Sequence, residues 1–288
     1  MLDLRSAGPP LVVCLLSSCL GGCTSDQFAT NGDGGSDALV ASDSPSSDAS
    51  TPDSSTVDGS ASDGTTITPF SCNPPPAGVL LCDNFDVFNS VTSGWTTAVL
   101  SNSGAFVSLD SVNFVSSPDS FRAEVQPGAD QFGTAALLYE TTTATFTTMV
   151  LRTNIRISTV DTAQEVELLE LRYNAKNLAG AVNVMIDATP PNVLTLHYQQ
   201  PATDGGLAIF APIALGNYAN NSWQELRIDF TQGPSAKITV LLNNVQVANV
   251  SPPFDAPLNG QRDFQLGLFA LNTSSNIVNY DNVFLLGL

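Results

Sequence analysis

The sequence has 288 residues and is strongly acidic, with 27 acidic residues, 9 basic residues and a formal net charge of −18. Only 12% of the residues are charged, against about 25% in ordinary soluble domains. Nine scattered basic residues cannot neutralise a row of phosphates, which excludes nucleic acid as a partner. His197 is the single histidine, so no Cys/His spacing typical of a zinc site is present.

The N-terminus has the pattern of an export signal. Residues 11–20 (LVVCLLSSCL) form a short apolar run behind Arg5. A membrane-spanning helix needs about 20 apolar residues, so this run indicates the h-region of a secretory signal. The following Leu20–Cys23 (LGGC) resembles the lipobox of bacterial lipoproteins. The resemblance implies a signal peptide over residues 1–22 and membrane attachment through a lipid on Cys23.

The alternative for this segment is a plain signal peptide that is cleaved nearby, with Cys23 an ordinary thiol. With lipidation, we expect an exported protein anchored at the outer membrane or cell surface. Cys14 and Cys19 lie in the signal, so Cys72 and Cys82 remain. A single pair of cysteines in an exported chain predicts a disulfide, and two free thiols are the alternative.

Residues 23–70 contain little besides Ser, Asp, Thr, Gly and Ala. Aspartate recurs at every fifth position from Asp43 to Asp63, and no basic residue accompanies it. Such a composition cannot bury enough apolar surface to offset the entropy of ordering, so we predict a disordered linker. Calcium capture by the aspartates is an alternative, but solvated spacing from the membrane is the better interpretation.

Residues 71–288 form one predicted all-β domain. Apolar and polar residues alternate with period two in many short runs, which is typical of half-buried strands. Clear examples are Phe121–Val125, Leu151–Ile157, Val193–Gln199, Trp223–Phe230 and Lys237–Leu242. Asn243 and Asn244 separate the last of these runs from residues 245–250, which predicts a tight hairpin. Together these features predict an antiparallel sandwich of two sheets.

Three segments resemble the concanavalin A-like lectin/glucanase (laminin-G-like) family. They are Leu81–Asp86 (LCDNFD) followed by Trp95, the paired runs 223–230 and 236–245, and the closing run Ile277–Phe284. The resemblance implies a jelly roll, one face of which carries sugar or peptide ligands in many members. The lipobox and linker also resemble those of surface lipoproteins from myxobacteria and their relatives.

The segment Glu165–Glu170 (EVELLE) is the strongest candidate for chemistry. Residues 165, 167, 170 and 172 are polar, whereas 166, 168, 169 and 171 are apolar. Strict alternation would divide each set between the two faces of a strand, unless one residue is inserted at Leu168-Leu169. We therefore predict a β-bulge there, which places Glu165, Glu167 and Glu170 on one face with Arg172.

This acidic row resembles the catalytic motif of laminarinase- and lichenase-type glycoside hydrolases. The resemblance implies that Glu165 is the nucleophile and Glu170 the acid/base of a retaining enzyme acting on β-glucans. Glu167 stands where that family has an aspartate, and its extra methylene would disturb the hydrogen bond to the nucleophile. The favoured alternative is a non-catalytic acidic face with a Glu170–Arg172 ion pair.

Further polar residues alternate with apolar ones in the next two predicted strands. These candidates for ligand binding, together with Arg172, are Asn183, Asp187, Thr195, His197 and Gln199. Their amide, carboxylate, hydroxyl and imidazole groups are those that form hydrogen bonds with sugar hydroxyls. A lone histidine on a strand is more often a simple surface residue.

The family resemblance also implies a structural calcium between the first and last strands. The matching positions are Asp83 or Asp86 and Asp281. Calcium takes six to eight oxygen ligands, so backbone carbonyls would have to complete the set. The alternative is that Asp281 caps a turn or pairs with an arginine.

Three functions remain from the sequence. The leading hypothesis is a surface lipoprotein whose jelly roll binds an extracellular glycan or another ligand without catalysis. The second is a glycoside hydrolase that uses Glu165 and Glu170, and the third is a structural or adhesion module for a protein partner.

Overall fold

The computed structural model describes residues 72, 75, 77–87, 90–101, 104–127, 134–160, 165–173, 182–189, 191–201, 207–252, 260–270 and 274–288. The chain divides into two units, residues 1–64 and residues 65–288, and every described residue lies in the second unit. The predicted signal peptide, the lipid on Cys23 and the linker 23–70 lie outside the described residues. Within the described ranges, no helix is long and apolar enough to span a membrane.

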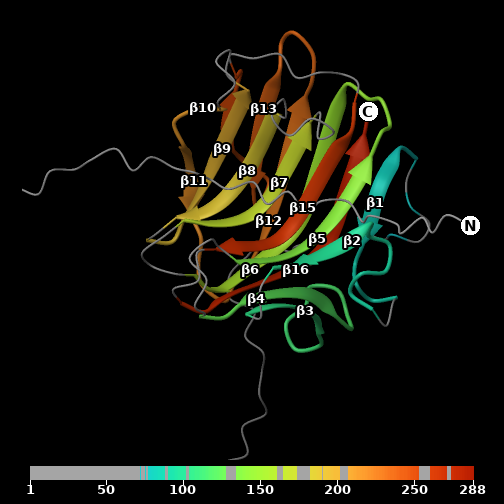
Figure 1. Cartoon of the computed structure of the whole chain (residues 1–288), viewed down its shortest axis with the longest axis vertical. Helices are drawn as coiled ribbons and strands as arrows, with labels where there is room; N and C mark the ends of the chain where they lie inside the picture. The colour runs from blue at the N-terminus through green and yellow to red at the C-terminus, as the bar shows by residue number, and fades with distance from the viewer. Residues whose placement is uncertain are drawn as a thin grey trace, which may run out of the picture. The chain divides into compact units, whose positions relative to one another are not determined.

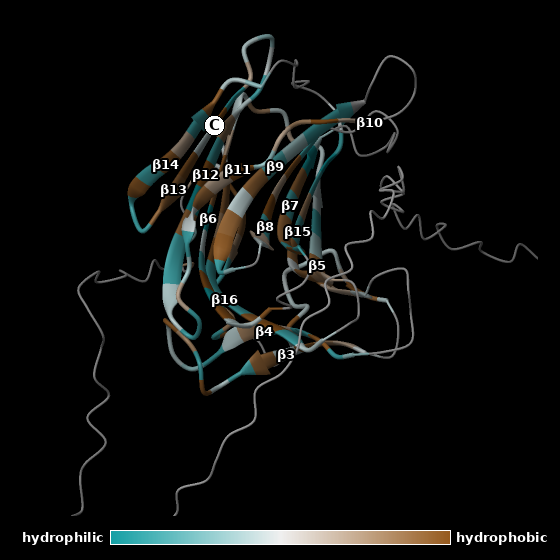
Figure 2. Cartoon of the chain, turned by 90° about the vertical axis from the view of Figure 1, so that its left-hand side faces the viewer, coloured by the Kyte–Doolittle hydropathy of each residue, from teal (hydrophilic) through white to brown (hydrophobic). Residues whose placement is uncertain are grey.

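The described residues form an antiparallel β-sandwich of two eight-stranded sheets, which confirms the predicted all-β jelly-roll class (Figures 1 and 2). Sheet A has the order β14-β13-β12-β6-β16-β4-β3, and β1 pairs with β16. Its strands are β1 (Val79–Asp83), β3 (Ala105–Asp110), β4 (Ser120–Val125), β6 (Thr148–Thr159), β12 (Trp223–Thr231), β13 (Lys237–Leu242), β14 (Val245–Val250) and β16 (Asn276–Gly287).

Sheet B has the order β10-β9-β8-β7-β15-β5-β2, and β11 pairs with β9. Its strands are β2 (Thr97–Leu100), β5 (Thr134–Thr142), β7 (Val166–Tyr173), β8 (Val182–Thr189), β9 (Val193–Pro201), β10 (Leu207–Ile209), β11 (Ile213–Asn217) and β15 (Arg262–Ala270). In two meanders, β7-β8-β9 and β12-β13-β14, strands that follow one another in the chain are also neighbours in the sheet. The late strands β15 and β16 instead insert between early strands, β15 between β5 and β7 and β16 between β4 and β6.

The core lies between the sheets. It follows from the alternation of hydrophobic and hydrophilic residues along the strands, which the colours of Figure 2 show. In β12, Leu226, Ile228 and Phe230 are fully buried, whereas Arg227 and Asp229 face outward. Burial of each such side chain contributes about 1.5–3 kcal/mol. Aromatic pairs pack within this layer. Phe85–Trp95 and Phe121–Tyr280 are stacked, Trp95–Phe264 is tilted, and Tyr173–Phe230 is T-shaped.

Two local predictions are confirmed. Asn243 and Asn244 both have positive φ, 51° and 63°, and they join β13 to β14 in a two-residue turn. Asparagine tolerates this left-handed backbone better than most residues, and two such residues in succession match the right-handed twist of a hairpin. The disulfide between Cys72 and Cys82 is present.

The segment LCDNFD, which carried the family resemblance, has a structural role. Asp83 accepts hydrogen bonds from Trp95 Nε1 and from the backbone N–H of Phe85, both at 2.8 Å. The same aspartate lies on β1, which pairs with the closing strand β16. One buried carboxylate therefore fixes Trp95 and the end of the first strand to the core.

The predicted β-bulge in β7 is confirmed. The β7–β8 register shifts between Glu167 and Leu169, so that Leu168 is the inserted residue. The pairing of β7 with β15 is also irregular at this level, between Leu266 and Phe269. Tyr280 of β16 reaches across the core to this interruption, with its hydroxyl 2.7 Å from the carbonyl oxygens of Leu168 and Gly267. Carbonyl groups that have left the regular ladder in a dry core need such a donor.

We expect Tyr280→Phe to lower the free energy of unfolding by about 1–3 kcal/mol, because two buried carbonyl groups lose the one hydroxyl hydrogen that they share. Tyr173→Phe is the matched control. Tyr173 is equally buried, but its hydroxyl has no hydrogen-bond partner among the described residues. Urea denaturation should show little loss, or a gain, for Tyr173→Phe. Equal losses in the two variants would contradict a special role for the Tyr280 hydroxyl.

Gly267 of β15 tolerates no side chain. Its φ is +143°, and a Cβ atom there would lie 2.2 Å from the carbonyl oxygen of Ala136. We therefore expect Gly267→Ala to cost more than about 3 kcal/mol, through both strain and displacement of β5. Gly94 also has a positive φ, +87°, but a Cβ atom there would meet no atom within 4 Å. Gly94→Ala should cost only about 1 kcal/mol in the same urea titration.

Candidate functional site

The outward face of sheet B carries most of the polar side chains that the sequence singled out. Because of the bulge, Glu167, Glu170 and Arg172 all face outward, whereas Leu168, Leu169 and Leu171 are buried in the core. This separation is the one that the sequence pattern predicted. We call this surface, formed by β5, β15, β7, β8 and β9, the polar face.

Strand register arranges the polar face in rows that run across the sheet. One row crosses β15, β7, β8 and β9 as Asp263, Arg172, Asn183 and Gln199. The next row runs Gln265, Glu170, Met185 and His197, and a third contains Glu167, Asp187 and Thr195. All the predicted catalytic and ligand-binding residues therefore lie on one face of three adjacent strands, with Glu165 directly before β7.

Glu170 is held in an ion pair on this face. The guanidinium of Arg172 donates to both of its carboxylate oxygens, and Gln265 Nε2 donates to one of them at 3.0 Å. Burial raises the pKa of the Glu170 carboxyl group, and the charge of Arg172 acts against that rise. The Glu170–Arg172 pair expected from the sequence is present, and Gln265 extends it to β15.

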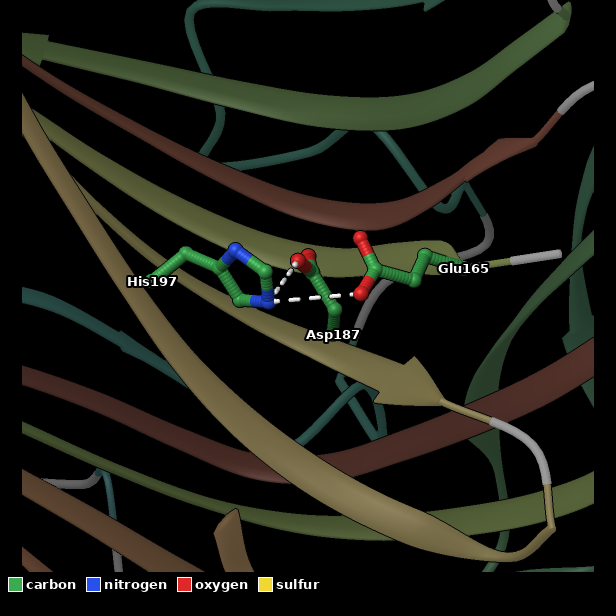
Figure 3. Close-up of side chains that lie close together, drawn as sticks. All are labelled: Glu165, Asp187 and His197. Atoms are coloured by element: carbon green, nitrogen blue, oxygen red, sulfur yellow. Dashed lines mark ion pairs between the residues drawn. The ribbon is translucent and has the colours of Figure 1, made fainter. Parts of the chain in front are cut away.

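A second cluster on the polar face brings together Glu165, directly before β7, Asp187 of β8 and His197 of β9. The Nε2 atom of His197 lies 3.2 Å from Asp187 Oδ2 and 3.7 Å from Glu165 Oε1. Figure 3 shows the three side chains pointing toward one another, with the Asp187 carboxylate between the other two. Thr195 Oγ1 lies 3.2 Å from the same imidazole nitrogen. Glu165 is about half exposed, whereas Asp187 is nearly buried.

Burial controls the protonation of this cluster. It raises the pKa of Asp187 to about 7, and the Glu165 and Glu170 carboxylates add to the rise. Burial also raises the pKa of Glu167, which pairs with Asp187 across the strands, well above its ordinary value, and the charges of Glu170 and Asp187 add to this rise. The pKa of the His197 imidazole is lowered by burial, and Glu165 opposes the change. The face thus combines carboxyl groups that hold protons unusually well with an imidazole that releases one easily.

The structure gives the two carboxylates of the predicted glycosidase pair different partners. Glu165 lies against His197 and Asp187, whereas Glu170 is held by Arg172 and Gln265. A retaining glycosidase needs an ionised and a protonated carboxyl group about 5–5.5 Å apart across the scissile bond. The roles of Glu165, Glu167 and Glu170 in hydrolysis stay predictions.

The predicted calcium ligands lie on or next to sheet A, around the paired strands β1 and β16. Asp281 accepts hydrogen bonds from the backbone N–H groups of Val115, Ser116 and Asn282 and from the Ser116 hydroxyl. Asp86 accepts one from the backbone N–H of Asp119. Together with Asp83, these carboxylates connect loops to the core strands. Calcium binding at Asp83, Asp86 and Asp281 stays a prediction.

Sequence reasoning missed the contribution of β15 and β5 to the polar face. Asp263 accepts hydrogen bonds from Thr141 Oγ1 at 3.1 Å and from Gln261 Nε2 at 3.0 Å. Burial raises the pKa of the Tyr139 hydroxyl, and its hydrogen bond with Asp263 adds to the rise. The alternation of Asp263 and Gln265 with Phe264 and Leu266 is typical of a strand, so β15 itself could have been predicted from the sequence. Its position beside β7 depends on pairing between segments about 95 residues apart in sequence.

Comparison with known proteins shows the fold. No protein-family model matches the chain, and no curated protein matches it. Solved structures do, among them an endo-β-1,4-glucuronan lyase from the fungus Trichoderma reesei, with a TM-score of 0.59 and 12% identity over 73% of this chain and 96% of the lyase. The alginate lyase Aly36B matches with a TM-score of 0.53 and 12% identity over 72% of this chain and 96% of its own.

A cellulose-induced protein, Cip1, matches with a TM-score of 0.51 and 18% identity over 71% of this chain and 96% of its own. The structural neighbours thus include polysaccharide lyases that are similar to this chain along nearly their whole length. At these identities, the likeness shows a shared β-sandwich fold.

Two ion pairs with the same spacing along a strand can be compared directly, one on the polar face and one on sheet A. In the Arg172–Glu170 pair the side chains are 14% and 4% exposed, whereas in the Arg227–Asp229 pair of sheet A they are 42% and 27% exposed. We expect Arg172→Met to lower the free energy of unfolding by about 3–5 kcal/mol, because it leaves a buried carboxylate uncompensated. Arg227→Met should cost about 0–1 kcal/mol. Thermal and urea unfolding of both variants would measure this difference, and similar costs would contradict it.

Proposed function

We propose that the polar face of sheet B binds a glycan without cleaving it, and that this glycan is uncharged. The observation that carries the proposal is the row Arg172, Asn183 and Gln199. Asn183 is 7% exposed, and its Oδ1 atom has no hydrogen-bond partner among the described residues. Such an acceptor costs about 1–3 kcal/mol when it stays unpaired, and a sugar hydroxyl is a suitable donor.

The surroundings of Asn183 suit a ligand rich in hydroxyl groups. Donors and acceptors from Arg172, Gln199 and Thr195 lie on the same face within two strands of it. Carboxyl groups accept hydrogen bonds when ionised and also donate one when protonated. The acidic residues of the face therefore suit sugar hydroxyls whichever protonation state they adopt.

Charge supports an uncharged glycan over a uronate polymer. Among the described residues, the polar face and its margin carry five carboxyl groups, Glu165, Glu167, Glu170, Asp187 and Asp263, against the cations Arg172 and, when protonated, His197. Even when Glu167 and Asp187 hold protons, the three other carboxyl groups outnumber Arg172, so a polymer with a carboxylate on every sugar would meet an excess of like charge. The named activities of the lyase neighbours concern glucuronan and alginate, so this chain would share their fold and differ in its ligand.

Export and a lipid on Cys23, supported by the sequence alone, complete the proposal. A domain on a flexible linker at the membrane can reach glycans outside the cell. Glu165 and Glu170 are held by different partners, and this division of the predicted catalytic pair favours capture over hydrolysis.

The test is a binding assay of the full-length protein against soluble β-glucans, alginate and glucuronan. We expect binding to an uncharged glucan and a loss of about tenfold or more in affinity for Asn183→Ala, since one lost hydrogen bond of about 1.4 kcal/mol has that effect. Asn249→Ala is the matched control, because Asn249 is an exposed asparagine on β14 of the other sheet.

Three results would contradict the proposal. One is preference for alginate or glucuronan, and another is equal affinity in the Asn183→Ala variant. The third is product formation. New reducing ends on a β-glucan that vanish in Glu170→Gln would favour the hydrolase alternative, and unsaturated sugars released from a uronan would favour a lyase.

A further inference from the structure

We propose that Glu165, Asp187 and His197 form a binding site for a divalent transition-metal ion of the zinc class. Glu165 lies directly before β7, Asp187 on β8 and His197 on β9. Their ligand atoms all lie within 4.8 Å of one another. His197 and Asp187 lie on the same polar face, in the two rows that follow the Arg172–Asn183–Gln199 row. The inference goes beyond glycan binding, and metal binding can be tested without a glycan.

The distances suit a first-row metal ion. Zinc binds imidazole nitrogen and carboxylate oxygen at about 2.0–2.2 Å in tetrahedral geometry, which separates neighbouring ligand atoms by roughly 3.3–3.6 Å. His197 Nε2 lies 3.2 Å from Asp187 Oδ2 and 3.7 Å from Glu165 Oε1. Small rotations of the three side chains would therefore place the ligand atoms around one ion.

Asp187 supplies a second, independent observation. The residue is only 7% exposed, and its Oδ1 atom has no hydrogen-bond partner among the described residues. Its Oδ2 atom faces His197, and its carboxylate is repelled by Glu165 and Glu170. A buried carboxylate in such a position is compensated either by a proton or by a cation. Figure 3 shows this carboxylate directed between the other two ligands.

The types of ligand select the metal. One imidazole and two carboxylates form a mixed nitrogen and oxygen set, which suits zinc and its neighbours in the first row. Calcium and magnesium prefer oxygen ligands alone. Three protein ligands, one of them half exposed, leave at least one coordination position open to solvent, which is the arrangement of zinc sites that bind water or a ligand.

The experiment is a calorimetric titration of the full-length protein with Zn²⁺ after dialysis against a chelator. We expect one ion per chain, with affinity reduced at least tenfold by His197→Gln and by Asp187→Asn. Asp229→Asn, which removes a carboxylate from the outward face of sheet A, is the control and should bind like the wild type. His197 is the single histidine of the chain, so a loss in His197→Gln identifies this site and not a cysteine site.

Thermal unfolding separates metal binding from folding. Zn²⁺ should raise the melting temperature of the wild type and of Asp229→Asn, and it should have no such effect on His197→Gln or Asp187→Asn. In chelator, Asp187→Asn should melt no lower than the wild type, because it removes a buried charge.

The inference would be overturned if the wild type bound no Zn²⁺, or if His197→Gln bound it equally well. Calcium titration tests the metal class. Tighter binding of Ca²⁺ than of Zn²⁺ that is lost in His197→Gln would refute a transition-metal site, whereas a weaker Ca²⁺ response would support it.

Discussion

The hydroxyl group of Tyr280, placed between the carbonyl oxygens of Leu168 and Gly267, is the interaction on which the polar face depends. In a regular strand, successive side chains point to opposite faces of the sheet. The apolar and polar residues of β7 can therefore occupy opposite faces only if one residue is inserted. The insertion interrupts the ladder where β7 meets β15. Tyr280 offers a donor from the opposite sheet, and Gly267 allows β15 to approach β5 closely at the same level.

One consequence is an unusual concentration of carboxyl groups on a nearly buried surface. Arg172 lies against Glu170, and burial together with the neighbouring acids raises the pKa values of Glu167 and Asp187. Such a surface raises the free energy of the folded chain when no ligand is bound, because its many hydrogen-bond acceptors share few donors. Both proposals follow from that cost: hydroxyl groups would satisfy the Asn183 row, and a metal ion would compensate Asp187.

The fold is shared with polysaccharide lyases, but a fold does not determine a function. The chemistry of this chain has to be read from its own polar face, where the described carboxyl groups outnumber the cations. The absence of a zinc-like spacing in the sequence does not argue against the proposed metal site, because its three ligands lie on separate strands and no short motif could encode them.

Local patterns in the sequence were enough to predict many of the strands, the bulge at Leu168, the hairpin at Asn243-Asn244 and the Cys72–Cys82 disulfide. Each of these follows from alternation, backbone preference or pairing over a few residues. Only the tertiary structure decided that β15 lies beside β7, which brings Gln265 to Glu170, and that Glu165 meets Asp187 and His197. The order of strands in a sheet depends on long-range pairing and on how two whole faces pack, and a single sequence carries no local signal for either.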